Sequence, residues 1–282
     1  MDKAVREWLL AGDPAVVWQV QRDLLGRAPR TWEAARRKVA RKGWGARLLA
    51  RRSSDGRWGQ ALYDPRWTST FYTLQLLVQL GVSPGHQDAK DSCELLLRQG
   101  VTDSGGVCLW KSGTTDTCVT AMLIHMACYF GLRTSRPVRR AVRWLLAEQM
   151  TDGGWNCKRA RGATHSSFHT TLSTLEALWT LRRQRGVATA IARAEEFFYQ
   201  HQLYRSHRTG RIARSSFAQF SFPTRWYFDV LRGLDYFQAR DASWDERLAE
   251  PVDLVRRRQR PDGRWDARNY HTGRTFFRLE PA

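Results

Sequence analysis

The sequence has few cysteines and no long apolar run. Its five cysteines are an odd number without CxxC spacing, which indicates neither a disulfide framework nor a zinc ribbon. The longest apolar runs fall far short of the roughly 20 residues that span a bilayer, so no transmembrane segment is expected. Residues 1–10 carry an acidic side chain at position 2 and only a short apolar patch, unlike a signal peptide. We therefore expect a cytoplasmic protein.

The sequence also lacks a Pro/Gly/Ser-rich or low-complexity stretch that would divide its 282 residues, although that length permits two domains. A hydrophobic content of 42% and 13 tryptophans argue against disorder. We predict one domain over residues 1–282. It comprises N-terminal helices (1–53), a repeat region (54–265) and a C-terminal tail (266–282).

Acidic residues are scarce relative to basic ones. Asp and Glu total 27 against 46 for Lys and Arg, which gives a formal net charge of +19. Such an excess favours contact with a polyanion, whether nucleic acid, an anionic membrane surface or a diphosphate-bearing substrate. An arginine-rich solvated surface would have the same composition, so the charge alone does not identify a partner.

A glycine turn followed by tryptophan recurs along the chain. The copies are Asp55-Gly-Arg-Trp58, Gly105-Gly-Val-Cys-Leu-Trp110, Asp152-Gly-Gly-Trp155 and Asp262-Gly-Arg-Trp265. The tryptophans are 52, 45 and 110 residues apart, and the last interval spans about two periods. We therefore expect a degenerate copy at Thr209-Gly-Arg-Ile212 and about five repeats in all.

The segments between the turns alternate in character. Those after the turns are apolar over most of their faces, which predicts buried helices at 67–80, 116–130, 170–181 and 226–237. Those before the turns mix apolar positions with Arg and Glu, which predicts helices with one wet face at 89–98, 138–149, 191–201 and 252–258. Such pairs cannot bury their apolar faces alone and must stack on neighbouring pairs.

Two of the turns are specific enough to suggest a family. Gln149-Met-Thr-Asp-Gly-Gly-Trp155 and Gln259-Arg-Pro-Asp-Gly-Arg-Trp265 resemble the Gln/Trp repeats of the squalene-cyclase and protein-prenyltransferase superfamily, over roughly residues 54–265. The resemblance implies an all-α fold, an α/α toroid in which the helix after each turn lies in the inner barrel. Little sequence follows Trp265, so the last repeat is expected to be incomplete and the toroid open or closed by the N-terminal helices.

Asp116 and Cys118 stand at the start of one predicted buried helix, and His169 lies one repeat later. Equivalent positions in adjacent parallel helices would meet at one rim, bringing together a carboxylate, a thiolate and an imidazole, a set suited to zinc with a fourth position open. Cys157 and His165 lie near His169 in the sequence, and either would serve as a fourth ligand or support one.

The metal set is similar to that of protein prenyltransferase β subunits, in which an Asp-x-Cys pair and a later His hold the zinc that activates a substrate thiolate. The matching residues are Thr115-Asp-Thr-Cys118 and Phe168-His-Thr-Thr171. The resemblance implies that Asp116, Cys118 and His169 are catalytic. The simpler alternative is that Asp116 caps a helix, Cys118 is a small core residue and His169 is a buried structural histidine.

Three basic residues precede predicted buried helices: Arg66, Lys111 and Arg225. Helix N-termini sharing one rim would favour an anion, so these residues are candidate anion ligands. The resembling enzymes grip prenyl diphosphate with an Arg and a Lys before the Asp-x-Cys pair and a Tyr after it. Here Lys111 stands alone in that window and Val119 replaces the Tyr, and an ordinary basic surface is the alternative.

The function predicted from these features is a zinc-dependent transferase of the protein-prenyltransferase type, which activates a thiol or water for alkyl or prenyl transfer. An anionic or thiol-bearing substrate is expected, with a partner subunit or a homo-oligomer. The absence of an Asp-x-Asp-Asp motif, a P-loop and a GxGxxG turn argues against terpene cyclisation and nucleotide-driven chemistry. The alternatives are a nucleic-acid-binding or nucleic-acid-modifying protein with a zinc site and a helical scaffold without catalysis.

Overall fold

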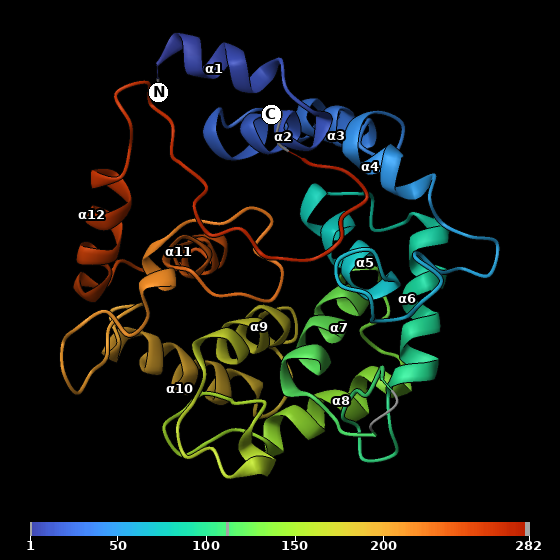
Figure 1. The fold of residues 1–282 in the computed structure, drawn as a ribbon, viewed down its shortest axis with the longest axis vertical. Helices are drawn as coiled ribbons and strands as arrows, with labels where there is room; N and C mark the ends of the chain where they lie inside the picture. Colours follow the sequence, from blue (N-terminus) through green and yellow to red (C-terminus); the bar gives the residue numbers. More distant parts are fainter. Residues whose placement is uncertain (1, 111–112, 280–282) are drawn as a thin grey trace. The chain divides into compact units, whose positions relative to one another are not determined.

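The computed structural model describes residues 2–110 and 113–279, and the fold is all-α (Figure 1). Over these residues it contains twelve α-helices and only isolated β-bridges, which confirms the predicted class. None of the described helices combines the length and apolar character needed to cross a bilayer. The chain divides into two compact units, Met1–Gln99 with Tyr129–Leu132 and Gly273–Ala282, and Gly100–Cys128 with Arg133–Thr272. The single toroid domain stays a prediction.

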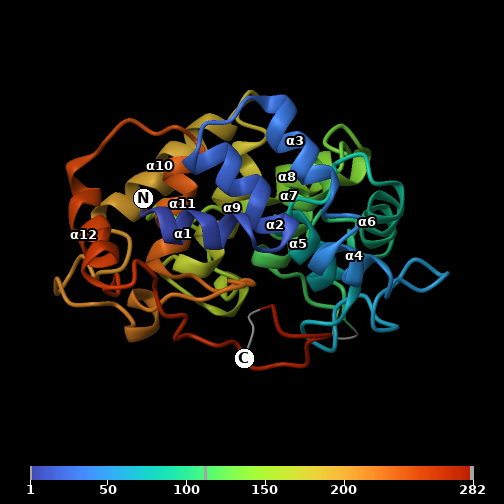
Figure 2. The ribbon, with the colours of Figure 1, turned by 90° about the horizontal axis from the view of Figure 1, so that it is seen from above.

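The first unit begins with the predicted N-terminal helices, which seal the end of a buried helix. They are α1 (Lys3–Leu10), α2 (Pro14–Gln19), a π-turn (Val20–Leu24), α3 (Pro29–Arg37) and α4 (Gly43–Leu49), with α2 and α3 side by side (Figure 2). They are followed by α5 (Thr70–Leu80), which is buried along most of its length, and by α6 (Gln87–Gly100). The Trp18 indole donates to the Leu80 carbonyl at 3.0 Å, and Arg36 donates to that of Gly81 at 2.9 Å. Carbonyls left without partners at the end of α5 are thereby satisfied.

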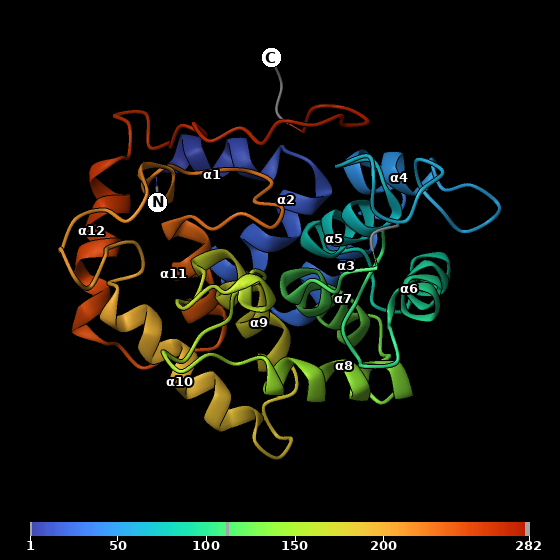
Figure 3. The same cartoon turned by 60° about the horizontal axis from the view of Figure 1, so that its bottom comes forward.

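In the second unit, buried helices alternate with helices that have one wet face. The elements are α7 (Thr117–Tyr129), α8 (Arg136–Ala147), α9 (Phe168–Trp179), α10 (Val187–Gln200), α11 (Val230–Ala239) and α12 (Ala249–Arg257). Nearly every residue of α7 and α9 is buried, whereas α8, α10 and α12 each keep exposed polar positions. α9 packs against α10 and α11, and Figure 3 shows α10 beside it. The predicted alternation is confirmed for α7 to α10, whereas α11, which the sequence predicts to be buried, leaves Leu231, Asp235 and Gln238 exposed.

Five turns share one backbone geometry. In four of them an amide donates to the carbonyl four residues later, at Ser53→Arg57, Thr102→Gly106, Met150→Gly154 and Arg260→Arg264, with distances of 2.8–2.9 Å. The fifth turn, Ser206→Arg211 at 2.8 Å, lies at the predicted degenerate copy and is one residue longer. Each turn contains a glycine with positive φ, a conformation that disfavours other residues.

Three of the four repeated tryptophans bind the end of the preceding helix, whereas the Trp110 indole donates to the Thr114 hydroxyl at 3.2 Å. The indole N–H donates to a carbonyl ten residues earlier, from Trp58 to Leu48 at 2.7 Å, from Trp155 to Leu145 at 2.7 Å and from Trp265 to Val255 at 2.8 Å. All three acceptors lie in the last turn of a helix, where carbonyls lack intrahelical partners. In these three repeats the tryptophan therefore joins the turn to the helix before it.

In three repeats a threonine hydroxyl links the turn to the helix that follows it. It accepts an amide hydrogen bond from the turn in three repeats: Trp58 to Thr70 at 3.1 Å, Val107 to Thr120 at 2.8 Å and Trp155 to Thr171 at 3.0 Å. The residues two positions before these threonines, Thr68, Cys118 and His169, therefore hold equivalent places in successive repeats.

Two predicted helix starts are too early. The segments expected from 67 and 226 become helical only at Thr70 and Val230. Trp67 has φ 73° and Arg225 has φ 56°, a left-handed backbone that cannot continue into a right-handed helix. The apolar pattern indicates the burial of Trp67 correctly but does not report the backbone turn.

Candidate metal centre

Asp116 and Cys118 meet at the N-terminus of α7, as the sequence predicts. The Asp116 amide donates to the Val107 carbonyl at 3.1 Å, which ties the residue to the preceding turn. Its Oδ1 accepts the Cys118 amide at 3.1 Å and the Cys118 thiol at 3.1 Å. Asp116 therefore accepts a backbone amide at the start of α7, and its carboxylate also lies beside the Cys118 sulfur.

Cys157 completes a group of three metal-ligating atoms. It follows Trp155 in the loop before α9, and its Sγ accepts the Cys118 amide at 3.2 Å. The Thr170 hydroxyl lies 3.2 Å from the same sulfur. The ligand atoms of Asp116, Cys118 and Cys157 all lie within 4.8 Å of one another. Atoms bound to a tetrahedral zinc are roughly 3–4 Å apart, so the group fits this ion after a small contraction.

The site is covered on one side and accessible on the other. Cys118 is buried, whereas Asp116 and Cys157 are half-buried. The pKa of the Cys118 thiol is raised well above its usual value, first by its hydrogen bond with Cys157, then by burial and by the charges of Cys157 and Asp116. The sulfurs must lose their protons to bind a metal, so occupancy would release protons.

His169 lies outside this group of three and is held by another element. Its Nδ1 accepts the Phe228 amide at 2.7 Å, and its ring packs edge-on against Phe217 and Trp226 with centroids 5.3 Å apart. A neutral ring that accepts through Nδ1 carries its proton on Nε2. Metal-bound histidines instead donate their second N–H to an acceptor. The structure thus associates Cys157, rather than His169, with Asp116 and Cys118.

The other predicted ligands are dispersed. His165 is exposed, and its Nε2 lies 2.7 Å from the Arg208 guanidinium. Arg66 is exposed in the first unit, and Arg225, 6% exposed, belongs to the second. Lys111 lies outside the described residues. The alternative interpretation, that these arginines belong to an ordinary solvated basic surface, therefore applies to Arg66 but not to Arg225.

Several contacts of the site could not be found from the sequence. Thr170 follows His169 in the motif Phe168-His-Thr-Thr171. This position is only a weak indication that Thr170 contacts Cys157. Phe228 binds His169 through its backbone amide, which no residue type identifies. The His271 ring stacks on Tyr227 with centroids 3.8 Å apart, although the two residues are 44 positions apart in the sequence.

The environment of His169 predicts a loss of stability in mild acid. Burial, followed by the charges of Arg214 and Arg232, lowers its pKa from 6.5 to about 4. The unfolded chain therefore takes up a proton as pH falls through 6.5, and the folded chain only near 4. The free energy of unfolding should therefore decrease as the pH falls from 6.5 to about 4, by at most about 3 kcal/mol. Urea unfolding between pH 7 and 4.5 measures this loss.

A matched pair of variants assigns the acid sensitivity to one histidine. His169→Asn retains a side-chain acceptor but cannot gain the charge, so its pH dependence should be shallower than that of the wild type. His165→Asn changes an exposed histidine four residues earlier and should leave the profile unchanged. Parallel profiles for the wild type and His169→Asn would contradict the assignment.

The comparisons with known proteins bear on the fold alone. No family model matches the chain, and no curated protein is similar to it. A solved structure, the crystal structure of a protein from Actinoplanes, is similar with a TM-score of 0.52 and 20% sequence identity. The alignment covers 90% of this chain and 71% of that one.

Proposed function

We propose that this chain is a zinc-dependent enzyme that holds its metal with Asp116, Cys118 and Cys157 and activates a thiol or a water. The observation that supports this proposal is the convergence of one carboxylate oxygen and two sulfurs within 4.8 Å at the start of a buried helix. Carboxylate and thiolate together suit zinc, and three protein ligands leave one position for a substrate. A zinc ion bound there would supply a Lewis acid that lowers the pKa of a thiol or water.

The protein's own groups prepare the site for that role. The Cys118 amide is shared between Asp116 Oδ1 and Cys157 Sγ, so the backbone at the start of α7 orients two ligands at once. The Thr170 hydroxyl contacts Cys157 from α9 and restrains its sulfur. Half-exposed Asp116 and Cys157 leave a side of the site through which a substrate can approach.

The transferase form of this proposal depends on the repeat. Five equivalent turns and the alternation of buried and half-exposed helices support an α/α toroid of about five helix pairs. Residues 266–279, which follow the last turn, contain no helix. The resemblance of the Asp116/Cys118 pair to the Asp-x-Cys pair of the prenyltransferase β subunits favours attack by a substrate thiol. Transfer of a prenyl group would also require a site for the diphosphate, and the sequence matches that part of the family pattern less well than it matches the metal pair.

Metal analysis tests the site directly. Protein purified under reducing conditions without a metal-affinity tag should retain about one zinc per chain, and Cys118→Ala and Cys157→Ala should each lose most of it. Cys128→Ala is the matched control, because Cys128 is also on α7 but is absent from the group of three. A wild type that holds no zinc after incubation and removal of excess metal would refute the proposal.

Cobalt substitution separates the two candidate ligand sets. Sulfur-to-cobalt charge-transfer absorption increases with the number of thiolate ligands, so Cys157→Ala should reduce it by about half in the metal that remains bound. His169→Ala should leave both its intensity and the metal stoichiometry unchanged. Loss of metal in His169→Ala with retention in Cys157→Ala would replace this ligand set with the one predicted from the sequence.

A second candidate, action on nucleic acid, is favoured by the loop after Cys157. Lys158 and Arg161 are exposed there, and neither takes part in an ion pair with a described residue. If this loop contacts phosphates, Lys158→Gln/Arg161→Gln should weaken binding of a single-stranded oligonucleotide and reduce its salt dependence. Affinity that is flat between about 50 and 200 mM salt would exclude this candidate.

A further inference from the structure

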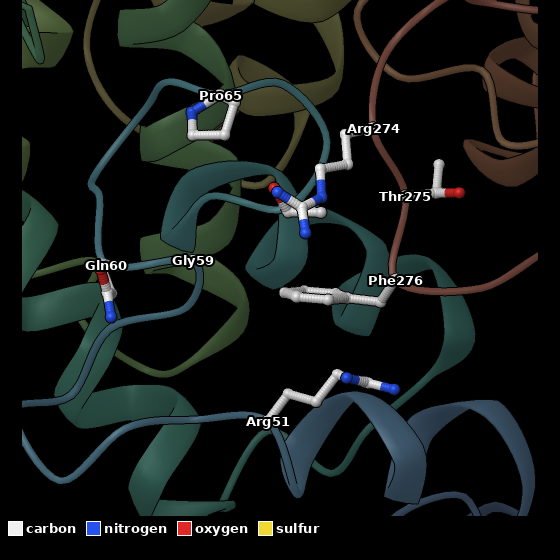
Figure 4. Close-up of a pocket in the computed structure, with 8 residues that line it drawn as sticks. Arg51, Gly59, Gln60, Pro65, Arg274, Thr275 and Phe276 are labelled. Carbon is white, nitrogen blue, oxygen red and sulfur yellow. The ribbon is translucent and has the colours of Figure 1, made fainter.

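The first unit contains a cavity of about 440 Å³ that is independent of the metal centre. Figure 4 shows it between the loop after the first turn and the C-terminal tail, from which Arg274 and Phe276 extend toward that loop. Its lining residues are Arg51, Gly59, Gln60, Pro65, Thr68, Arg274, Thr275 and Phe276. The volume is within the range of sites that bind small molecules.

Close backbone packing forms two walls of this cavity. Gly59 has φ 59°, and a Cβ there would lie 2.6 Å from the Thr68 carbonyl oxygen. Gly273, adjacent to Arg274, has φ 147°, and a Cβ there would lie 2.4 Å from Nε1 of Trp67. A larger residue at either position would force the loop or the tail to shift, so both close contacts depend on glycine.

Among the described residues, the lining carries positive charge without a counter-charge. Neither Arg51 nor Arg274 forms an ion pair with any residue in 2–110 or 113–279, and no carboxylate of these residues lines the cavity. Nearby arginines differ, since Arg52 pairs with Asp88 and Arg57 with Asp55, both at 3.8 Å. Gln60, Thr68 and Thr275 add neutral hydrogen-bonding groups.

An aromatic ring accompanies the two guanidinium groups. The Arg51 guanidinium lies 5.2 Å from the centroid of the Phe276 ring, which also lines the cavity. A guanidinium presents a fork of donors that matches a phosphate or carboxylate, and a ring provides an apolar face beside it. The lining thus combines recognition of an oxyanion with a surface for an apolar group.

We propose that this cavity binds a small organic anion whose oxyanion group is held by Arg51 and Arg274 and whose apolar part packs on Phe276. Thr68 supports a functional location, because it occupies the repeat position held by Cys118 in the metal centre. The site does not depend on the proposed zinc chemistry, since none of its lining residues belongs to the metal group.

Calorimetric titration at low salt with phenyl phosphate, benzoate and inorganic phosphate tests the proposal. We expect saturable binding of an aromatic anion, stronger than that of inorganic phosphate. Tighter binding of phenyl phosphate identifies a phosphate site, and tighter binding of benzoate a carboxylate site. Arg51→Gln and Arg274→Gln should each weaken binding about tenfold or more, because each removes a charge-assisted contact. Absence of saturable binding of either aromatic anion would overturn the proposal.

A neighbouring Arg–Phe pair provides matched controls. Arg47 lies four residues before Arg51 and stacks on Phe277 at 3.8 Å, and neither residue lines the cavity. Arg47→Gln should therefore leave affinity within about twofold of the wild type. Phe276→Ala should remove the preference for the aromatic anion, whereas Phe277→Ala should keep it. Equal weakening by Arg47→Gln and Arg51→Gln would reveal non-specific attraction to net charge and overturn the proposal. Circular dichroism of each variant checks that it is folded.

Discussion

Replacing Trp155 with alanine should lower the free energy of unfolding by about 3–5 kcal/mol, whereas the same change at Trp265 should cost about 1 kcal/mol. The two tryptophans occupy equivalent places in their repeats and make the same indole hydrogen bond, at 2.7 and 2.8 Å. They differ in burial, since the Trp155 side chain is 0% exposed and that of Trp265 is 43% exposed. The first variant leaves a large internal cavity, but the second only removes a hydrogen bond and some partial burial.

Urea unfolding of both variants at neutral pH measures the difference, with the slope of the transition checked for constancy. Because each variant loses the same hydrogen bond, the difference between them isolates the contribution of burial. Equal losses would contradict this prediction. They would mean that the hydrogen bond to the preceding helix, rather than packing of the indole, stabilises the repeat.

The features of the fold that could be predicted are those encoded within one repeat. Glycine followed by tryptophan identifies each turn because both determinants lie within a few residues, and even the degenerate copy at Gly210 forms its turn. The continuous apolar runs of α7 and α9 likewise predict burial correctly. Trp67 and Arg225 mislead because a left-handed backbone leaves no trace in hydrophobic spacing.

The candidate site could be predicted only in part because it joins several segments. Asp116 and Cys118 are two residues apart, so one helix start brings them together. Cys157 reaches them only because the loop after Trp155 folds back toward α7. His169 is drawn to the Phe228 amide, 59 residues later, by a contact that repeat spacing does not specify. The cavity in the first unit could not be predicted for the same reason, since Arg51 and Arg274 are far apart in the sequence.

Replacing Glu176 with glutamine should destabilise the protein by about 3 kcal/mol, because it leaves a buried cation without its counter-charge. Glu176 on α9 accepts from Arg232 on α11 through both carboxylate oxygens, at 3.0 and 2.6 Å. The Arg232 side chain is only 6% exposed, and its other hydrogen bonds reach neutral groups, the Ser173 hydroxyl and the Tyr227 carbonyl. The nearby Asp229 carboxylate interacts with its charge but accepts no hydrogen bond from the guanidinium among the described contacts. Glutamine keeps the shape of the glutamate but supplies neither the charge nor the second acceptor.

Two further variants distinguish this buried charge from ion pairs in general. Asp253→Asn removes an exposed pair, with side chains 52% and 76% exposed at 3.5 Å, and should cost no more than about 0.5 kcal/mol. Glu176→Gln combined with Arg232→Met removes the uncompensated cation and should recover part of the stability lost in Glu176→Gln alone. Urea unfolding of all three at neutral pH provides the comparison. If the double variant is less stable than Glu176→Gln, the arginine itself supports the packing of α9 against α11 through its neutral contacts, and the explanation by unpaired charge is wrong.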